Sequence, residues 1–307
     1  MSKKSYFGVN GVARNVKSWP VGIGNVARKA KSGYFGVGGV ARQFLGGVDP
    51  VLNNNDWATI RAVSDASQGA NYWSVGDTKT ITINGKVGAT TFSNLSIDAY
   101  IIGFNHNSAK EGSNRIHFQI GKATNGKDIA FCDSNYGQNG SSNGFRMNLS
   151  DTNSGGWNGS YGRNTLLGNS GTPAVPPANS FMAALPADLR AVMKPVTKYT
   201  NNTGVSNISG AVTATTDYLF LLAEFEVQGT RSLANQYEQN YQAQYDYYKA
   251  GNSKVKYRHD AIGSAVRHWC RSARYNSGSY FCIVSTSGAA NTDPASYSRG
   301  LAPGFAV

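Results

Sequence analysis

Three short phrases near the start of the chain share one alternation of apolar and small polar residues. FGVNGVAR (7–14), VGIGNVAR (21–28) and FGVGGVAR (35–42) recur every 14 residues, which indicates a repeated structural unit. In each phrase an apolar residue is followed by Asn-Gly, Gly-Asn or Gly-Gly and then by valine. Such pairs favour two-residue β-hairpin loops because they adopt positive φ angles. The pattern therefore predicts a small β-meander over residues 5–45.

This repeat is too short to bury a hydrophobic core of its own, so we expect it to fold against a partner. Residues 1–48 contain no acid and carry +8 of the chain's net charge of +12, which leaves +4 for the remainder. We interpret them as a cationic strand face that docks on an acidic protein surface. The alternative, a nucleic-acid arm, is disfavoured because the arginines occupy regular strand positions rather than a dense run. The regularly placed docking candidates are Val12, Arg14, Val26, Arg28, Val40 and Arg42.

The pattern changes after a linker rich in Asn, predicted at residues 49–56. A larger domain is expected over residues 57–307. Within it, alternating polar and apolar positions predict β-strands over 78–85, 95–104 and 115–121. The first of these ends in Asn-Gly, which predicts a turn at that point.

The second half of the chain mixes polar loops with more apolar segments. Residues 133–180 are rich in Asn, Gly and Ser and are predicted to be mainly loop, with one short helix at 160–167. Helices are predicted over 183–194 and 232–250, since each is followed by a residue that ends helices. The apolar run 217–227 predicts a central buried strand.

Two side-chain patterns lie on these elements. Glu224 and Glu226 share one face of the predicted strand. Paired carboxylates can perform acid–base catalysis, but on a strand they more often bind Arg or backbone groups. Four tyrosines at helical spacing favour a packing face of the second helix over a ligand site. They are Tyr237, Tyr241, Tyr245 and Tyr248.

The composition favours an α+β class with mixed or antiparallel strands and long polar loops. Apolar residues make up 40% of the 307 residues, enough for a core, but charged residues only 15%. This balance is common in adhesins and particle proteins and less typical of cytosolic metabolic enzymes. The chain has neither an apolar stretch of membrane-spanning length nor a hydrophobic signal core. We therefore expect synthesis in the cytoplasm without a signal peptide, and no membrane partner.

Little in the sequence indicates catalysis. His106, the most suggestive of four histidines, is expected to be structural, and no two histidines lie at metal-ligand spacing. Nucleophile-elbow and phosphate-loop motifs are missing from the sequence. We therefore predict no enzyme, no metal and no cofactor. The three cysteines are expected to be small buried residues, although a Cys270–Cys282 bridge stays open.

The segment 273–300 is dense in Tyr, Ser, Asn and Gly. Tyrosine gives a large rigid contact area, and Ser and Asn give adaptable hydrogen bonds, so this mixture is typical of binding loops. Ordinary solvated loops use the same residues, so both interpretations remain open on composition alone.

Several distinctive motifs follow one another along the larger domain. They include WSVGDTKTITING (73–85), GWNGSYGRNTLLGN (156–169), HWCRSARYNSGSYFCIVSTSGAAN (268–291) and GLAPGFAV (300–307). With these motifs in this order, residues 57–307 resemble an uncharacterised domain family of phages and prophages of gut Gram-positive bacteria. The triple GVAR phrase is similar to an N-terminal repeat of phage structural proteins. The family has Leu and Pro where this chain has Cys270 and Ala273, so the conformation of the following loop is less constrained.

The C-terminal part also resembles the C-type-lectin-like fold of formylglycine-generating enzymes and of retroelement variable proteins. In that fold a W-x-R-S strand is followed by polar loops and a closing strand, and the loops of the variable proteins bind ligand. The resemblance implies a ligand-binding face here, although a fold does not fix a function. Its expected members are Tyr275, Asn276, Tyr280, Asn291, Asp293, Tyr297 and Arg299.

These resemblances imply a phage virion protein of the tail tip, a head fibre or a decoration. We expect residues 1–48 to anchor it to other virion proteins, and its lectin-like loops to bind a bacterial surface glycan or protein. We expect a homo-oligomer on the virion surface, with nucleic acid not a partner. The alternative is a purely structural decoration protein without a ligand. The sequence leaves open head or tail location and copy number.

Overall fold

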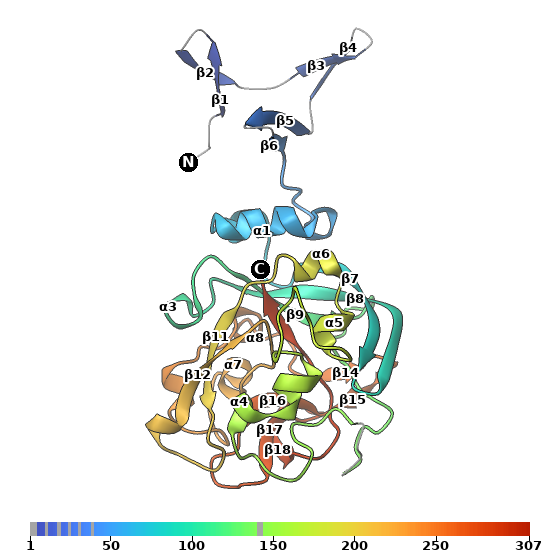
Figure 1. The fold of residues 1–307 in the computed structure, drawn as a ribbon, viewed down its shortest axis with the longest axis vertical. Helices are drawn as coiled ribbons and strands as arrows, with labels where there is room; N and C mark the ends of the chain where they lie inside the picture. Colours follow the sequence, from blue (N-terminus) through green and yellow to red (C-terminus); the bar gives the residue numbers. More distant parts are fainter. Residues whose placement is uncertain are drawn as a thin grey trace. The chain divides into compact units, whose positions relative to one another are not determined.

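The computed structural model describes residues 5–9, 12–16, 20–23, 26–29, 32–37, 40–139 and 144–307, with side chains from residue 47 onward. The chain divides into two compact units, residues 1–49 and 50–307. Figure 1 draws the first unit in blue and the second in the remaining colours. The predicted linker, 49–56, contains the 3-10 turn η1 (Leu52–Asn54), and Leu52 and Asn55 are buried in the second unit.

The first unit consists of three antiparallel hairpins. They are β1 (Ser5–Val9) with β2 (Val12–Val16), β3 (Pro20–Ile23) with β4 (Val26–Lys29), and β5 (Ser32–Val37) with β6 (Val40–Gly46). In each hairpin the strand ends pair across two residues, as the repeat predicts. Those two turn residues lie outside the described part of the chain.

The predicted meander is wrong in one respect. Within the described residues each hairpin is a separate two-stranded sheet, and no strand of one hairpin pairs with another hairpin. Pro20 begins β3 and has no N–H to donate to a second neighbour, which disfavours pairing of β3 with β2. The three arginines of the repeat take equivalent places, since the backbones of Arg14, Arg28 and Arg42 each face an apolar residue of the partner strand.

A five-stranded antiparallel sheet forms the centre of the second unit (Figure 1). Its order is β13 (Leu219–Phe220), β19 (Gly304–Ala306), β9 (Ile116–Lys122), β8 (Thr90–Phe104) and β7 (Thr78–Val87). The predicted strands at 78–85, 95–104 and 115–121 are confirmed. The turn predicted at Asn84-Gly85 is wrong, because β7 passes through that point with a shift of register and continues to Val87. Gly85, at φ +130°, permits this bulge.

The longest helix, α1 (Trp57–Asp65), packs its first residue against this sheet. Asp56 caps the helix by accepting a hydrogen bond from the Thr59 backbone N–H at 2.7 Å. The ring of Trp57 lies edge-on to Phe118 and Phe305, with centroids 5.6 and 5.8 Å away. No helix of the described residues is long and apolar enough to cross a membrane.

Three smaller sheets complete the unit. They are β11 (Val196–Asn201) with β12 (Val212–Asp217); β10 (Ile129–Ala130), β14 (Lys256–Arg258) and β15 (Ala261–Val266); and β16 (His268–Ala273), β17 (Tyr280–Val284) and β18 (Ala290–Pro294). All their pairings are antiparallel except β10 with β14. The predicted α+β class is confirmed at this level.

The helices other than α1 are short. They are α2 (Gly69–Tyr72), α3 (Ser108–Glu111), α4 (Gly156–Gly159), α5 (Phe181–Ala184), α6 (Ala187–Arg190), α7 (Glu224–Gln228) and α8 (Asp246–Lys249), with the 3-10 turns η3 (Ser209–Ala211) and η4 (Glu238–Asn240). The helix predicted at 160–167 is present as the π-helical turn η2 (Gly162–Leu166).

Three other predicted elements are wrong. The helix at 183–194 is two turns, α5 and α6, because Pro186 cannot continue a helix and holds Leu185 extended. The strand at 217–227 ends at Phe220 and is followed by α7, where Glu226 accepts a hydrogen bond from the Ala223 N–H at 3.0 Å. The helix at 232–250 is an irregular segment that is helical only at η4 and α8.

The tyrosine pattern and the cysteines can now be placed. Tyr245 and Tyr248 are buried, whereas Tyr237 and Tyr241 are half-buried, so the four do not form one face of a helix. The cysteines are all buried free thiols, and Cys270 on β16 and Cys282 on β17 are not bridged.

Candidate functional site

Four charged side chains meet inside the second unit, each no more than 2% exposed. We call Glu111, Lys198, Glu226 and Arg271 the core charge cluster. Glu111 ends α3, Lys198 lies in β11, Glu226 in α7 and Arg271 in β16. The cluster therefore joins four elements that are distant in sequence.

Lys198 is the centre of the cluster. Its ammonium group donates to Glu111 Oε2 at 2.6 Å, to Glu226 Oε1 at 3.1 Å and to the Tyr245 hydroxyl at 2.8 Å. The ring of Phe220 covers it, with the centroid 4.2 Å from Nζ. All three donor positions of the ammonium are thus used, which is what a buried lysine requires.

Arg271 binds the same carboxylate from the other side. Its Nη2 donates to Glu226 Oε1 at 2.7 Å, and its Nη1 donates to Glu226 Oε2. The same guanidinium bonds the Leu221 carbonyl at 3.0 Å and the Thr200 hydroxyl at 2.8 Å. Two carboxylates therefore face two cations, and a bidentate Arg–carboxylate pair is the strongest contact among them.

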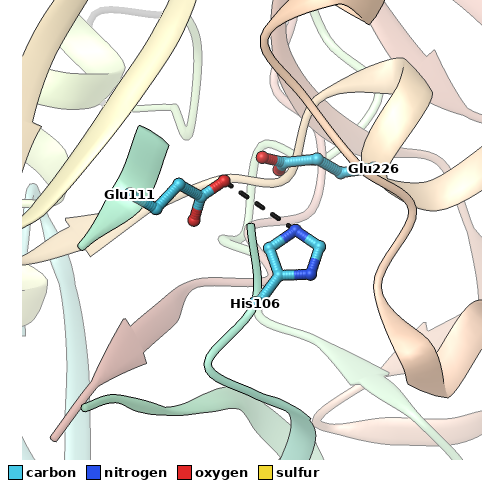
Figure 2. A group of neighbouring side chains, drawn as sticks. All are labelled: His106, Glu111 and Glu226. Carbon is cyan, nitrogen blue, oxygen red and sulfur yellow. Dashed lines mark ion pairs between the residues drawn. The ribbon is translucent and has the colours of Figure 1, made fainter. Parts of the chain in front are cut away.

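Two histidines border the cluster. The ring of His106 stacks on Tyr245 with centroids 3.6 Å apart, and His117 Nδ1 lies 3.1 Å from the Tyr245 hydroxyl. The two imidazoles are 5.7 Å apart between centroids. In Figure 2 the side chains of His106, Glu111 and Glu226 converge, and His106 Nε2 lies 3.8 Å from Glu111 Oε1.

Burial and neighbouring charges set the protonation of these groups. Burial, together with the charge of Lys198, lowers the pKa of His106 to about 3, so the imidazole is neutral at pH 7. Burial raises the pKa of Glu111 to about 7, against the opposing effect of Lys198. Burial also acts to raise the pKa of Glu226, but Arg271 and Lys198 outweigh it and hold that pKa below its ordinary value.

The cluster resembles a metal site in its donor set but not in its charge. His106, Glu111 and Glu226 each offer one ligand atom, and these atoms lie within 4.8 Å of one another. His106 Nε2 also has no hydrogen-bond partner. Lys198 already bridges the two carboxylates, however, so a divalent cation there would meet an ammonium and a guanidinium. These residues fit an internal ion network rather than a metal centre.

Sequence reasoning found only part of this cluster. His106 and Glu226 stood out as candidates, but Glu111, Lys198 and Arg271 did not. The spacing of histidines gave no sign that His106 and His117 meet, because β8 and β9 bring them together through strand pairing. Arg271 had one usable signal, a charged residue inside a strand that is buried throughout.

The predicted ligand-binding residues fall into two places. Tyr275, Asn276 and Tyr280 lie around Arg274, where β16 turns into β17. Arg274 donates to Asn276 Oδ1 at 2.8 Å and to the Thr292 hydroxyl at 3.1 Å. Its guanidinium carbon is 5.7 Å from the centroid of the Tyr280 ring. We call Arg231, Arg274, Tyr275, Asn276, Tyr280 and Thr292 the Arg274 patch.

Asp293 and Arg299 lie below the surface and are bonded to each other. Arg299 Nε donates to Asp293 Oδ2 at 2.6 Å, and Arg267 donates to the other carboxylate oxygen at 3.0 Å. The two side chains are each only 7% exposed. Their expected place on an open binding face is therefore wrong, because buried charges require internal partners. Tyr297 is half-buried with its ring 4.9 Å from the Arg299 guanidinium, while Asn291 is exposed on β18.

Comparison with known proteins gives one match. A family model described as a domain of unknown function (DUF6273) matches residues 145–307, slightly more than half of the chain. The matched range includes the Arg274 patch and three members of the core charge cluster, but not Glu111. No curated protein and no solved structure matches the chain.

Proposed function

We propose that this chain, which belongs to the DUF6273 family, is a structural protein of a bacteriophage particle. In this proposal residues 1–48 anchor it to other virion proteins. The second unit is a C-type-lectin-like domain that is displayed on the particle surface and binds a glycan or protein of the host.

The observation that carries the proposal is the set of three equivalent hairpins. Both strands of a two-stranded sheet are edge strands, so each hairpin can extend a sheet of a partner through its free backbone groups. Three copies with an arginine at the same register position suit a partner with a repeated acidic surface. Each hairpin alone is too small to be stable, which favours folding on assembly.

The order of elements in the second unit supports the lectin-like part of the proposal. The strand with Trp269 and Arg271 is followed by polar loops, by β17 and β18, and by the closing strand β19. The Trp269 indole donates to the Phe145 carbonyl at 2.9 Å, so this strand is fixed beneath the loops. Such a rigid support under variable loops is typical of binding domains.

Display of many copies on one particle would compensate for weak binding of the host surface by each single domain. A displayed domain that binds weakly gains strength when several copies bind the same cell surface. We therefore propose a homo-oligomer on the virion, with head or tail location decided by the partner of the hairpins.

The host-binding part can be tested with intact host cells. The fluorescently labelled full chain should sediment with host cells and not with unrelated bacteria, and unlabelled chain should compete. If the chain stays in the supernatant at every concentration tried, the domain is a decoration without a ligand. If the chain instead clears a suspension of host cell walls, it degrades them. In that case neither ligand binding nor decoration accounts for its function.

A further inference from the structure

We propose that the Arg274 patch binds an acidic polysaccharide, whose anionic groups meet Arg231 and Arg274 and whose sugar rings lie against Tyr275 and Tyr280. This inference rests on the proposed host-binding function and names its ligand class. It is argued from the charge, the hydrogen bonding and the support of the patch.

The two arginines of the patch have no carboxylate partner among the residues whose side chains are described. Arg274 bonds only the neutral groups of Asn276 and Thr292, and Arg231 bonds the Ala234 carbonyl at 2.9 Å. Arg258 and Arg267 of the same unit are paired with an aspartate, whereas Arg115, Arg146 and Arg190 also bond only carbonyl oxygens. The patch differs from those three because two arginines without a carboxylate lie on paired backbone segments. The patch therefore carries positive charge that an anionic ligand can neutralise.

The backbone segment that follows Arg231 pairs with the segment that contains Arg274. Ala234 pairs with Arg274 in an antiparallel bridge, and the Tyr275 N–H donates to the Leu233 carbonyl at 3.1 Å. Arg231 lies over the Tyr275 ring, with 5.7 Å between the guanidinium carbon and the ring centroid. Arg231 thus lies against Tyr275, and Arg274 lies against Tyr280.

A buried carboxylate fixes this segment from below. Glu224 is 1% exposed, and its two oxygens accept hydrogen bonds from the backbone N–H groups of Ser232, Leu233 and Ala234 at 2.7–3.1 Å. The carboxylate offsets part of the positive charge of the patch, but its oxygens are occupied by the backbone. Both arginines are half-buried, and their guanidinium groups are the charged groups of the patch without a carboxylate partner, on a support that is already ordered.

The residue types of the patch match the anionic groups and the sugar rings of an acidic polysaccharide. A guanidinium binds phosphate or carboxylate through two parallel hydrogen bonds. Tyrosine offers a flat apolar face with a hydroxyl at its edge, and Asn276 and Thr292 offer donors and acceptors for sugar hydroxyls. A neutral glycan would leave the two guanidinium charges without partners, so the patch favours an acidic one.

Binding of the full chain to three defined polysaccharides tests the inference. They are polygalacturonate, which carries carboxylates, phosphomannan, which carries phosphodiesters, and neutral mannan. The chain should bind at least one acidic polymer and not neutral mannan, with weaker binding as salt is added. The bound polymer tells which anion is recognised. Short single-stranded DNA serves as a fourth probe, and preferential binding to it would replace the polysaccharide proposal with a nucleic-acid one.

Variants connect binding to the patch. Removal of both charges in R231Q/R274Q should weaken binding to the acidic polymer by at least about tenfold, since each lost charge-assisted contact is expected to cost several-fold in affinity. Lys86→Gln, which removes an exposed charge from β7, should bind like the wild type. The Tm of each variant shows that the fold is retained.

The outcomes separate this inference from the proposed function. If the chain binds host cells but R231Q/R274Q binds them equally well, the patch is not the site, although host binding stands. If acidic polysaccharide is bound through the patch but host cells are not, the ligand class stands and the choice of host is wrong. Equal binding of neutral mannan, or no binding of either acidic polymer, overturns the inference.

Discussion

At the residue scale the most consequential feature is the core charge cluster. Two carboxylates and two cations are removed from water together, so each depends on the others for stability. The cluster joins α3, β11, α7 and β16 through ion pairs between their side chains. Its groups are inaccessible to a substrate, so we assign it to the stability of the domain that presents the loops.

Loss of Lys198 should strongly destabilise the protein. Lys198→Met leaves Glu111 and Glu226 buried with only Arg271 to balance them, and breaking a buried ion pair in this way costs about 3–5 kcal/mol. Lys86→Met, at an exposed site on β7, should change the free energy of unfolding by no more than about 0.5 kcal/mol. Urea unfolding measures both. Equal stabilities of the two variants would contradict the role given to Lys198.

Glu111 in the cluster and His106 beside it should have opposite effects on the pH dependence of stability. His106 has a pKa of about 3 in the folded chain against 6.5 ordinarily, so the unfolded chain binds more protons between these values and stability falls as pH falls. Glu111 has a pKa of about 7 against 4.5 ordinarily, so the folded chain binds more protons in that range and its contribution grows as pH falls. The two effects partly cancel in the wild type.

Two variants should separate these effects. Between about pH 7 and pH 5, the free energy of unfolding should depend less on acidification in His106→Asn than in the wild type, and more in Glu111→Gln. Urea titrations at several pH values give the slopes. The buried histidines His117 and His268, whose pKa values are also lowered by burial, keep part of the acid sensitivity in both variants. Identical slopes in all three proteins would contradict the assignment.

At the element scale, regular alternation was readable from the sequence and irregular segments were not. The burial of β7 follows its apolar and polar positions, and the hairpins follow the repeated two-residue turn pairs. The strand β9 was also predicted, but it is buried on both faces, including its polar residues His117 and Gln119. Residues 232–250 have helical spacing of tyrosines, yet tertiary contacts decide their conformation: Glu224 binds the backbone of 232–234, and Glu238 accepts a bond from Asn201 at 2.9 Å. These partners lie too far away in sequence for a local pattern to reveal.

The sequence predicted the residues of the Arg274 patch only in part. Composition located the Tyr- and Asn-rich loops, but it could not tell the exposed Asn276 from the buried pair Asp293 and Arg299. Arg231 was missed because its place beside Tyr275 depends on the bridge between Ala234 and Arg274.

The hairpin arginines give a prediction at the same scale. The triple variant R14Q/R28Q/R42Q should be incorporated into particles less efficiently, because each equivalent contact with an acidic partner loses its charge. A control with the same net charge, K4Q/K29Q/K31Q, removes lysines outside the repeated GVAR phrase. Quantitative immunoblots of purified particles compare the variants. Equal loss in both would show that total charge, and not the repeated position, matters.

At the scale of the whole molecule, the two units differ in composition and in proposed task. Residues 1–48 hold most of the net positive charge, and their described strands form hairpins, whereas residues 50–307 hold the core and the Tyr- and Asn-rich loops. This division is what a displayed domain with a separate anchor requires. It leads us to expect that the second unit is accessible on an assembled particle while the first is covered by its partner.

Immunogold electron microscopy tests the central claim most directly. An antibody against residues 50–307 is applied to intact phage particles purified from cells that carry the gene, with particles from cells lacking the gene as control. The proposal predicts gold on the exterior of the particle, at the tail tip for a receptor-binding protein or over the head for a fibre or decoration. Intact particles without label, from a lysate in which the chain is abundant, would contradict it.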